Sequence, residues 1–131
     1  MNKTTGDPNV MDVTFNAAQT GPGQNPFTFA PSQLDVPSGV QEIQMPLSTV
    51  NGGSDKAVFD PTTPIVWVSG GQPIPRPSNF SAPELKNGGT LLVMTDTNDD
   101  KEETVYDIEI RVDFNGTPYT SPDPTIVNLP P

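Results

Sequence analysis

The sequence predicts an all-β protein, an immunoglobulin-like Greek-key β-sandwich of about seven or eight short strands. Three observations predict this fold class. Apolar and polar residues alternate with a period of two in several segments, as they do in strands that bury one face. Turn-forming residues separate these segments, and the 131-residue chain holds 11 Gly and 17 Pro. No segment keeps the 3.6-residue period of an amphipathic helix, so helix content should be small.

The N-terminal half should contain a tail and several short strands. We expect residues 1–9 to form a flexible tail and residues 10–131 to form a single domain. Pro46 cannot donate a hydrogen bond to a ladder, so it should lie at a strand end or on an edge strand. The expected strands of this half are residues 10–15, two pieces at 27–29 and 34–36 that are separated at Pro31, residues 40–47 and residues 57–59.

The middle of the chain combines a buried strand with a stiff connector. Residues 65–68 (IVWV) are a continuous apolar run, typical of a strand that is covered on both faces. Residues 72–77 (QPIPRP) should be extended, polyproline-like backbone. Residues 81–86 carry a capping-box pattern and are followed by glycines, which predicts one short helical turn.

The last third gives the clearest pattern. In residues 104–114 every second side chain is apolar, so one face of this strand should meet the core and the other should meet water. Asn115-Gly116 then favours a type I′ hairpin turn. By analogy with immunoglobulin domains, Trp67 should lie in the core and Tyr106 should form a tyrosine corner. Further strands are expected at residues 91–95, 117–120 and 125–127.

Composition excludes several kinds of chemistry and partner. The chain has no Cys and no His, which removes Ser-His and Cys-His nucleophile systems and the usual zinc ligands. The formal net charge of −10 disfavours binding to nucleic acid and to anionic membranes. Because Cys and His are missing, we expect a protein that is not an enzyme and has no cofactor. No signal peptide and no apolar run long enough to span a membrane is visible, so we expect a cytoplasmic protein, with a processed secreted protein or a released subunit as the alternative.

One acidic segment, TDTNDDKEETVYD, raises the possibility of a calcium site. Asp96, Asn98 and Asp100 stand at positions 1, 3 and 5 of a calcium-loop pattern, and Asp107 stands at position 12. However, Lys101 occupies position 6, where the pattern requires Gly, and position 12 should be Glu. We therefore expect a solvated acidic turn whose Asp and Asn side chains bond their own backbone, with no tightly bound metal.

The sequence also contains residue types that serve two other kinds of site. Trp67, Phe80, Phe27 and Phe29 could stack on a sugar, and Phe80 is expected to be the most exposed of them. A pair of carboxylates from the acidic segment could serve glycoside hydrolysis only across a cleft, which a single exposed loop does not provide. The function that the sequence favours is a non-enzymatic interaction or structural module that binds another protein or self-associates through an exposed strand edge. The alternative is a carbohydrate- or calcium-binding module.

The C-terminal residues DPTIVNLPP and the hairpin FNGTPYTSPDPTI resemble the tail of the DP-EP family, which are small bacterial proteins of uncharacterised function. The segment QLDVPSGVQEIQMPL resembles an earlier part of these proteins. This chain departs from the family ending because Leu129-Pro130 stands where Glu-Pro is expected. The resemblance implies a bacterial source and an all-β sandwich, and it implies no activity and no site residues.

Overall fold

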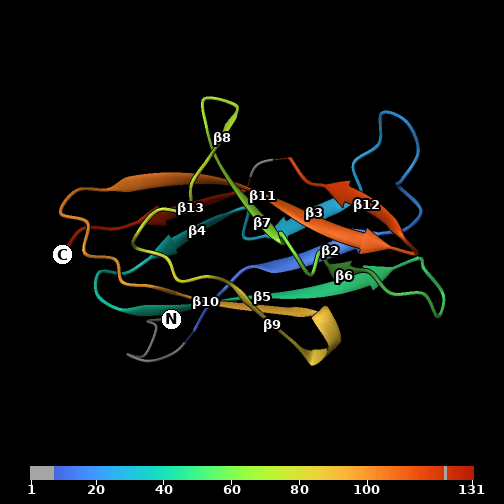
Figure 1. Cartoon of the computed structure of the whole chain (residues 1–131), viewed down its shortest axis with the longest axis horizontal. Coiled ribbons are helices and arrows are strands. Elements are labelled where there is room, and N and C mark those ends of the chain that lie inside the picture. Colours follow the sequence, from blue (N-terminus) through green and yellow to red (C-terminus); the bar gives the residue numbers. More distant parts are fainter. Residues whose placement is uncertain (1–7, 123) are drawn as a thin grey trace.

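The computed structural model describes residues 8–122 and 124–131, which form two β-sheets packed face to face (Figure 1). This confirms the predicted all-β sandwich. The first sheet contains β1 (Asn9–Val10), β2 (Asp12–Asn16), β3 (Phe27–Ala30), β5 (Gln41–Val50), β9 (Glu84–Lys86) and β10 (Leu91–Asp96). The second contains β4 (Gln33–Val36), β6 (Val58–Phe59), β7 (Ile65–Ser69), β8 (Gln72–Ile74), β11 (Thr104–Phe114), β12 (Thr117–Thr120) and β13 (Thr125–Asn128).

The described residues thus form thirteen strands, more than the seven or eight expected. The extra strands are short pieces, such as β1, β6, β8 and β9, which have two or three residues each. Such pieces carry too few residues to show an alternating pattern. They become recognisable only through the partner strand with which each pairs.

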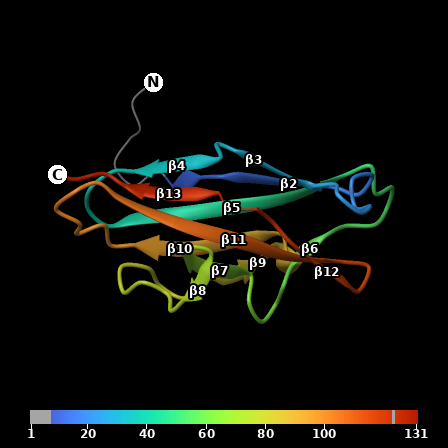
Figure 2. The ribbon, with the colours of Figure 1, turned by 90° about the horizontal axis from the view of Figure 1, so that it is seen from above.

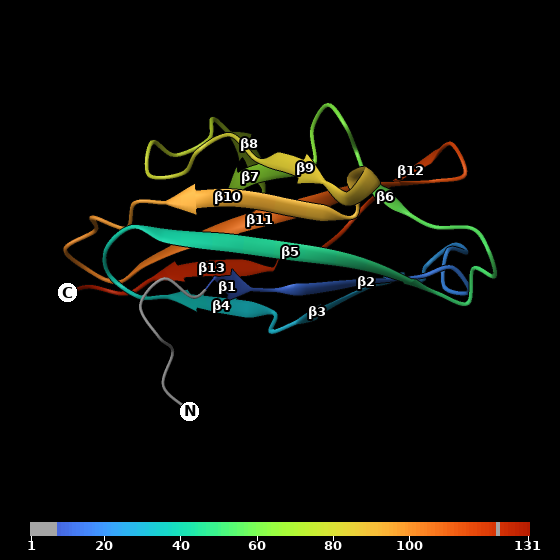
Figure 3. The same ribbon diagram turned by 90° about the horizontal axis from the view of Figure 1, so that it is seen from below.

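Both sheets mix parallel and antiparallel pairs. The first has the order β3-β2-β5-β10-β9, and β1 and β2 both run parallel to β5. The second has the order β4-β13-β11-β7-β8, with β4 parallel to β13 and with β12 and β6 on the far half of β11. The long strands β5 and β11 run along most of the molecule, one in each sheet (Figures 2 and 3).

The core lies between the sheets and follows the predicted alternation. On β11, Ile108 and Ile110 are fully buried, whereas the neighbouring Arg111 is exposed. The predicted inward face of the N-terminal strand is also buried, and so is Trp67. The core is made of Met11, Val13, Phe15, Phe27, Leu34, Val36, Ile43, Met45, Leu47, Ala57, Phe59, Ile65, Trp67, Phe80, Leu92, Met94, Ile108, Ile110, Val112 and Ile126.

The predicted helical turn at residues 81–86 is wrong. Glu84–Lys86 form strand β9, which pairs antiparallel with β10, and Leu85 lies opposite Leu92. The only helical turn among the described residues is the 3-10 turn Asn87–Gly89, which connects these two strands. The hydrogen bonds of the ladder and the contact of Leu85 with the core therefore outweigh the local capping pattern.

The placement of Pro46 also differs from the prediction, because β5 is a central strand. The N–H of the next residue, Leu47, bonds to Thr90 O beside β10. Since successive N–H groups of a strand alternate in direction, the proline nitrogen faces β1 and β2. On that side of β5, strand pairing is interrupted at Met11, between β1 and β2. The N–H that Pro46 lacks is therefore missing at a break in the ladder.

Strand structure begins at Asn9, one residue before the predicted domain boundary. The Asn9 side chain is buried, and its Nδ2 donates to Gln41 Oε1 at 3.2 Å and to Glu42 O at 3.0 Å. Residues 1–7 of the predicted tail lie outside the described residues. Within the part of the chain that the structure describes, no helix is long and apolar enough to cross a membrane.

Candidate functional site

A cluster of polar side chains lies at one end of the sandwich, where the β10–β11 loop, the β4–β5 turn and the C-terminal segment meet (Figures 1 and 3). This polar cluster consists of Asn79, Asp96, Asn98, Asp100, Tyr106 and Asn128. Its members come from both sheets, because β10 belongs to the first and β11 and β13 belong to the second. Asp96, Asn98 and Asn128 are buried, with at most 1% of each residue exposed.

Asn98 joins three parts of the chain. Its Nδ2 donates to Val36 O at 3.0 Å, to Pro37 O at 2.7 Å and to Leu129 O at 3.1 Å. Its main-chain N–H donates to Asp96 Oδ1 at 2.9 Å, which forms an Asx turn. The residue has a positive φ of 33°, which Asn tolerates better than most residues. Asn98 therefore fixes the loop to the β4–β5 turn and to the end of β13.

Asn128 joins the two aspartates of the cluster. Its Nδ2 donates to Asp96 Oδ1 at 3.1 Å and to Asp100 Oδ2 at 3.0 Å. Asp100 also accepts from Tyr106 OH at 2.8 Å and, through Oδ1, from Asn79 Nδ2 at 3.1 Å. Both oxygens of Asp100 are thus occupied, and this carboxylate holds the loop against β11 and β13.

The same contacts shift the pKa values of the cluster. Burial raises the pKa of Asp96, the charges of Asp100 and Asp99 raise it further, and the hydrogen bonds from Asn98 and Asn128 offset this only in part. Burial also acts to raise the pKa of Asp100, but the hydrogen bonds from Asn128, Tyr106 and Asn79 outweigh it and lower the pKa. Burial and the bond to Asp100 raise the pKa of Tyr106.

Three buried oxygens of the cluster have no hydrogen-bond partner: Asp96 Oδ2, Asn98 Oδ1 and Asn128 Oδ1. Buried polar atoms in folded proteins are nearly always paired with protein, water or an ion. The nitrogen atoms fix the orientation of both amides, because each Nδ2 faces only acceptors. All three unpaired atoms are therefore acceptors.

The structure brings together three of the four predicted calcium ligands. Asp96, Asn98 and Asp100 belong to the polar cluster, whereas Asp107 lies on β11 opposite Val68 and Thr125. The predicted bond of an acidic side chain to its own backbone is confirmed by the Asx turn at Asp96. The expectation of a solvated turn is wrong for Asp96, because this residue is completely buried. Among the described residues, no three Asp or Glu side chains are grouped so that they could hold a metal.

The aromatic residues do not form a surface platform. Phe80, which was expected to be the most exposed of them, is only 2% exposed, so that prediction is wrong. Its ring packs on Trp67 at 4.4 Å and on Tyr106 at 5.0 Å between centroids, and the residue forms a β-bridge with Asp96. Tyr106 resembles a tyrosine corner, but its hydroxyl bonds to the side chain of Asp100 and not to the main chain.

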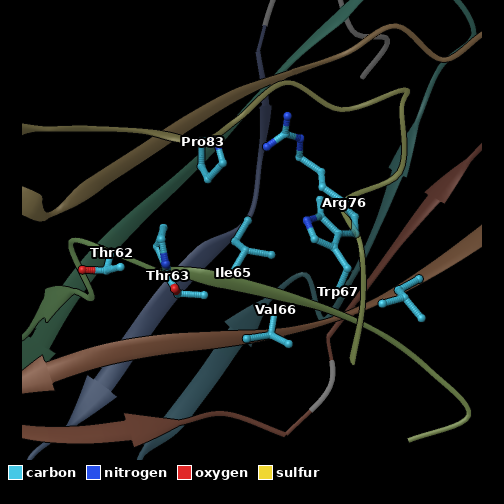
Figure 4. Close-up of a pocket in the computed structure, with 9 residues that line it drawn as sticks. Thr62, Thr63, Ile65, Val66, Trp67, Arg76 and Pro83 are labelled. Carbon is cyan, nitrogen blue, oxygen red and sulfur yellow. The ribbon is translucent and has the colours of Figure 1, made fainter. Parts of the chain in front are cut away.

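Two shallow pockets flank strand β8 on the second sheet. The first, of about 290 Å³, is lined by Ile65, Trp67, Ile74, Arg76 and neighbouring residues (Figure 4). Figure 4 shows that Ile65 and Trp67 point to the Arg76 side of β7, while Val66 points to the opposite side. The second pocket has a volume of about 240 Å³. Its walls are Trp67, Val68, Ser69, Ile74, Pro77, Val105, Tyr106 and Asp107.

No protein-family model matches the chain, and no curated protein is significantly similar to it. The resemblance to the DP-EP family therefore stays a prediction. The geometry of the chain itself carries the functional argument.

Sequence reasoning missed Asn79, Tyr106 and Asn128 as members of the polar cluster. Asn79 and Asn128 lie 20 or more positions from their carboxylate partners in the sequence, so no local spacing connects them. The one available signal was an Asn directly after the apolar residues of β13, at the end of a strand. Tyr106 was singled out only for its position on β11.

Proposed function

We propose that this protein is a non-enzymatic interaction module that self-associates through the surface around Ile74. This Ile74 surface comprises Ile74, Arg76, Val105 and Asp107. The observation that carries the proposal is the exposure of two large apolar side chains beside the two pockets: Ile74 is 39% exposed and Val105 is 57% exposed. Both side chains line the second pocket, and apolar side chains that are exposed beside a pocket are typical of a protein contact surface.

Pairing of strand edges, the route that the sequence suggested, is disfavoured by proline. While β1, β6 and β12 each pair with one strand beside the two main strand orders, the strands at the ends of these orders are β3, β9, β4 and β8. Proline cannot donate to a ladder and is one of the residues that natural sheets use to protect their edges. The prolines within or beside these strands are Pro26, Pro31, Pro37, Pro73, Pro75 and Pro83.

A second copy of the chain fits the charges of the Ile74 surface. Ile74 lines both pockets, with Arg76 at the first and Asp107 at the second. Arg76 lies on the Trp67 side of β7, whereas Asp107 pairs with Val68 and lies on the other side, so the two charges flank the β8 edge of the sheet. A twofold contact that wraps this edge pairs Arg76 of one copy with Asp107 of the other. This pairing is favourable in a chain whose net charge of −10 otherwise makes copies repel each other.

Size-exclusion chromatography with light scattering tests this proposal. We expect a species of twice the 14.0 kDa chain mass, and we expect Ile74→Glu to convert it to the monomer. The matched control is Val40→Glu, because Val40 is also apolar and exposed but belongs to neither pocket. A wild-type protein that stays monomeric at every concentration would refute self-association.

Exchanging the charges of Arg76 and Asp107 tests whether the Ile74 surface forms the contact between copies. Arg76→Glu and Asp107→Arg should each weaken the dimer, since each places like charges opposite one another. The double variant should recover association, because it restores opposite charges with the sign reversed. If both single variants dimerise as well as the wild type does, the contact lies elsewhere.

A further inference from the structure

The three unpaired oxygens of the polar cluster belong to residues that meet at one atom. Asp96 Oδ1 accepts from the Asn98 N–H at 2.9 Å and from Asn128 Nδ2 at 3.1 Å. Asp96 Oδ2, Asn98 Oδ1 and Asn128 Oδ1 are the atoms left over, and all three are buried. One carboxylate and two amide carbonyls thus belong to residues that are joined through Asp96 Oδ1, and the described residues supply no donor to the three unpaired oxygens.

The local donors cannot meet this need. Asn98 Nδ2 already donates to three main-chain carbonyls, and Asn128 Nδ2 already donates to two carboxylates. The charges that act on Asp96 are those of Asp99 and Asp100, which are both negative. A buried carboxylate without a compensating positive charge is energetically costly.

Counting donors separates the species that could fill the site. A proton on Asp96 Oδ2 supplies one donor for the two remaining oxygens, and one water molecule supplies two donors for three acceptors. A single cation can bind several oxygen ligands at once, and it also neutralises a carboxylate. Carboxylate and amide carbonyl oxygens are hard ligands, of the kind that calcium prefers.

We propose that Asp96, Asn98 and Asn128 bind a calcium-class cation, with water completing its coordination. The three ligands come from the end of β10, the β10–β11 loop and the end of β13, so the cation joins the two sheets. Asp100, whose oxygens are already hydrogen-bonded, contributes charge and holds Asn128 in place. This site is independent of the proposed self-association, since no residue of the Ile74 surface belongs to it.

Calorimetric titration with calcium chloride, together with thermal melting, tests the site. With a single formal charge among its three ligands, the site should have a Kd on the order of 10⁻⁴ to 10⁻³ M, as extracellular calcium modules do. Calcium at ten times Kd should raise the melting temperature by about 5 °C in a chain of this size. Sodium chloride at the same ionic strength should leave it nearly unchanged.

The informative variant is Asp96→Asn, and Asp99→Asn is its matched control. Asp96→Asn keeps the shape of the side chain, removes the charged ligand and adds an amide that can donate to the unpaired oxygens. It should weaken calcium binding at least about tenfold, a loss of ~1.4 kcal/mol. Asp99→Asn removes the same charge from the exposed part of the loop, and it should keep the Kd within about twofold.

Terbium luminescence provides a readout that does not depend on stability. Terbium replaces calcium in oxygen sites, and its emission is excited by nearby aromatic side chains such as Tyr106, which bonds to Asp100 in the cluster. In the wild type we expect terbium emission that decreases when calcium is added, because calcium displaces terbium. In Asp96→Asn we expect this emission to be absent. The proposal is overturned if calcium has no effect, if sodium chloride acts equally, or if Asp96→Asn binds as the wild type does.

Discussion

Removing the side-chain amide of Asn98 should be among the most destabilising single changes in the loops of this protein. Asn98→Ala deletes three hydrogen bonds, to Val36 O, Pro37 O and Leu129 O. The amide has two hydrogens, one of which is shared between two carbonyls, so at about 1 kcal/mol per hydrogen the bonds contribute ~2 kcal/mol to the free energy of unfolding. Removing the unpaired Oδ1 raises the free energy of unfolding by about 1 kcal/mol, because a buried acceptor without a partner is lost. Placing Ala at a φ of 33° lowers it by about as much. The expected net loss is ~2 kcal/mol.

Urea unfolding, followed by the fluorescence of the buried Trp67, measures this loss. Asn98→Asp distinguishes lost hydrogen bonds from lost volume, because it keeps the shape but turns a carboxylate toward three carbonyls. It should destabilise at least as much as Asn98→Ala does. Thr97→Ala, an exposed change in the same loop, should stay within about 0.5 kcal/mol of the wild type. A loss below about 1 kcal/mol for Asn98→Ala would refute the reasoning.

Three further predictions concern the hairpin turn, the buried carboxylate and a close approach between elements. Gly116 has a φ of 82°, so Gly116→Val should lower the free energy of unfolding by roughly 1–3 kcal/mol, and an unchanged urea midpoint would contradict this. Because burial raises the pKa of Asp96 above its unfolded value of 3.8, the native state binds its proton more tightly, so this group costs stability as the pH rises through the window above 3.8. In calcium-free buffer, the free energy of unfolding of the wild type minus that of Asp96→Asn should therefore fall as the pH rises through that window. Urea unfolding at several pH values measures this difference, and a difference that rises with pH would contradict the prediction. Gly89→Ala should lower the melting temperature, because the added Cβ would lie 3.2 Å from Val58 Cβ at a φ of 92°, and differential scanning calorimetry would reveal whether it does.

The sequence predicted those parts of the fold that depend on local alternation. The strand at residues 104–114 coincides with β11, and the hairpin at Asn115-Gly116 is confirmed by positive φ values of 53° and 82°. Both signals are local, because the alternation lies within one segment and the turn type depends on two adjacent residues. The helical turn at residues 81–86 was wrong because its capping pattern is also local, while the pairing of β9 with β10 decides the structure there.

The polar cluster was only half visible in the sequence. The spacing of Asp96, Asn98 and Asp100 identified the loop, since loop ligands lie close together along the chain. Asn128 could not be found in this way, because it reaches the loop through the packing of β13 beside β11. Burial of Asp96 likewise depends on how the two sheets close at this end, which no pattern within thirteen residues of sequence expresses.

The pairing of β4 with β13 has a consequence for the order of folding. These parallel strands come from opposite ends of the chain, and β13 lies between β4 and β11. Among the described strands, β4 has no other partner, so this edge of the second sheet cannot assemble before β13 is available. Closing so long a loop carries an entropic cost before any contact repays it, so we expect this edge to form late and the chain to fold slowly. During synthesis, the partly made chain therefore exposes apolar residues of β4 such as Leu34 and Val36, which β13 helps to cover in the native state.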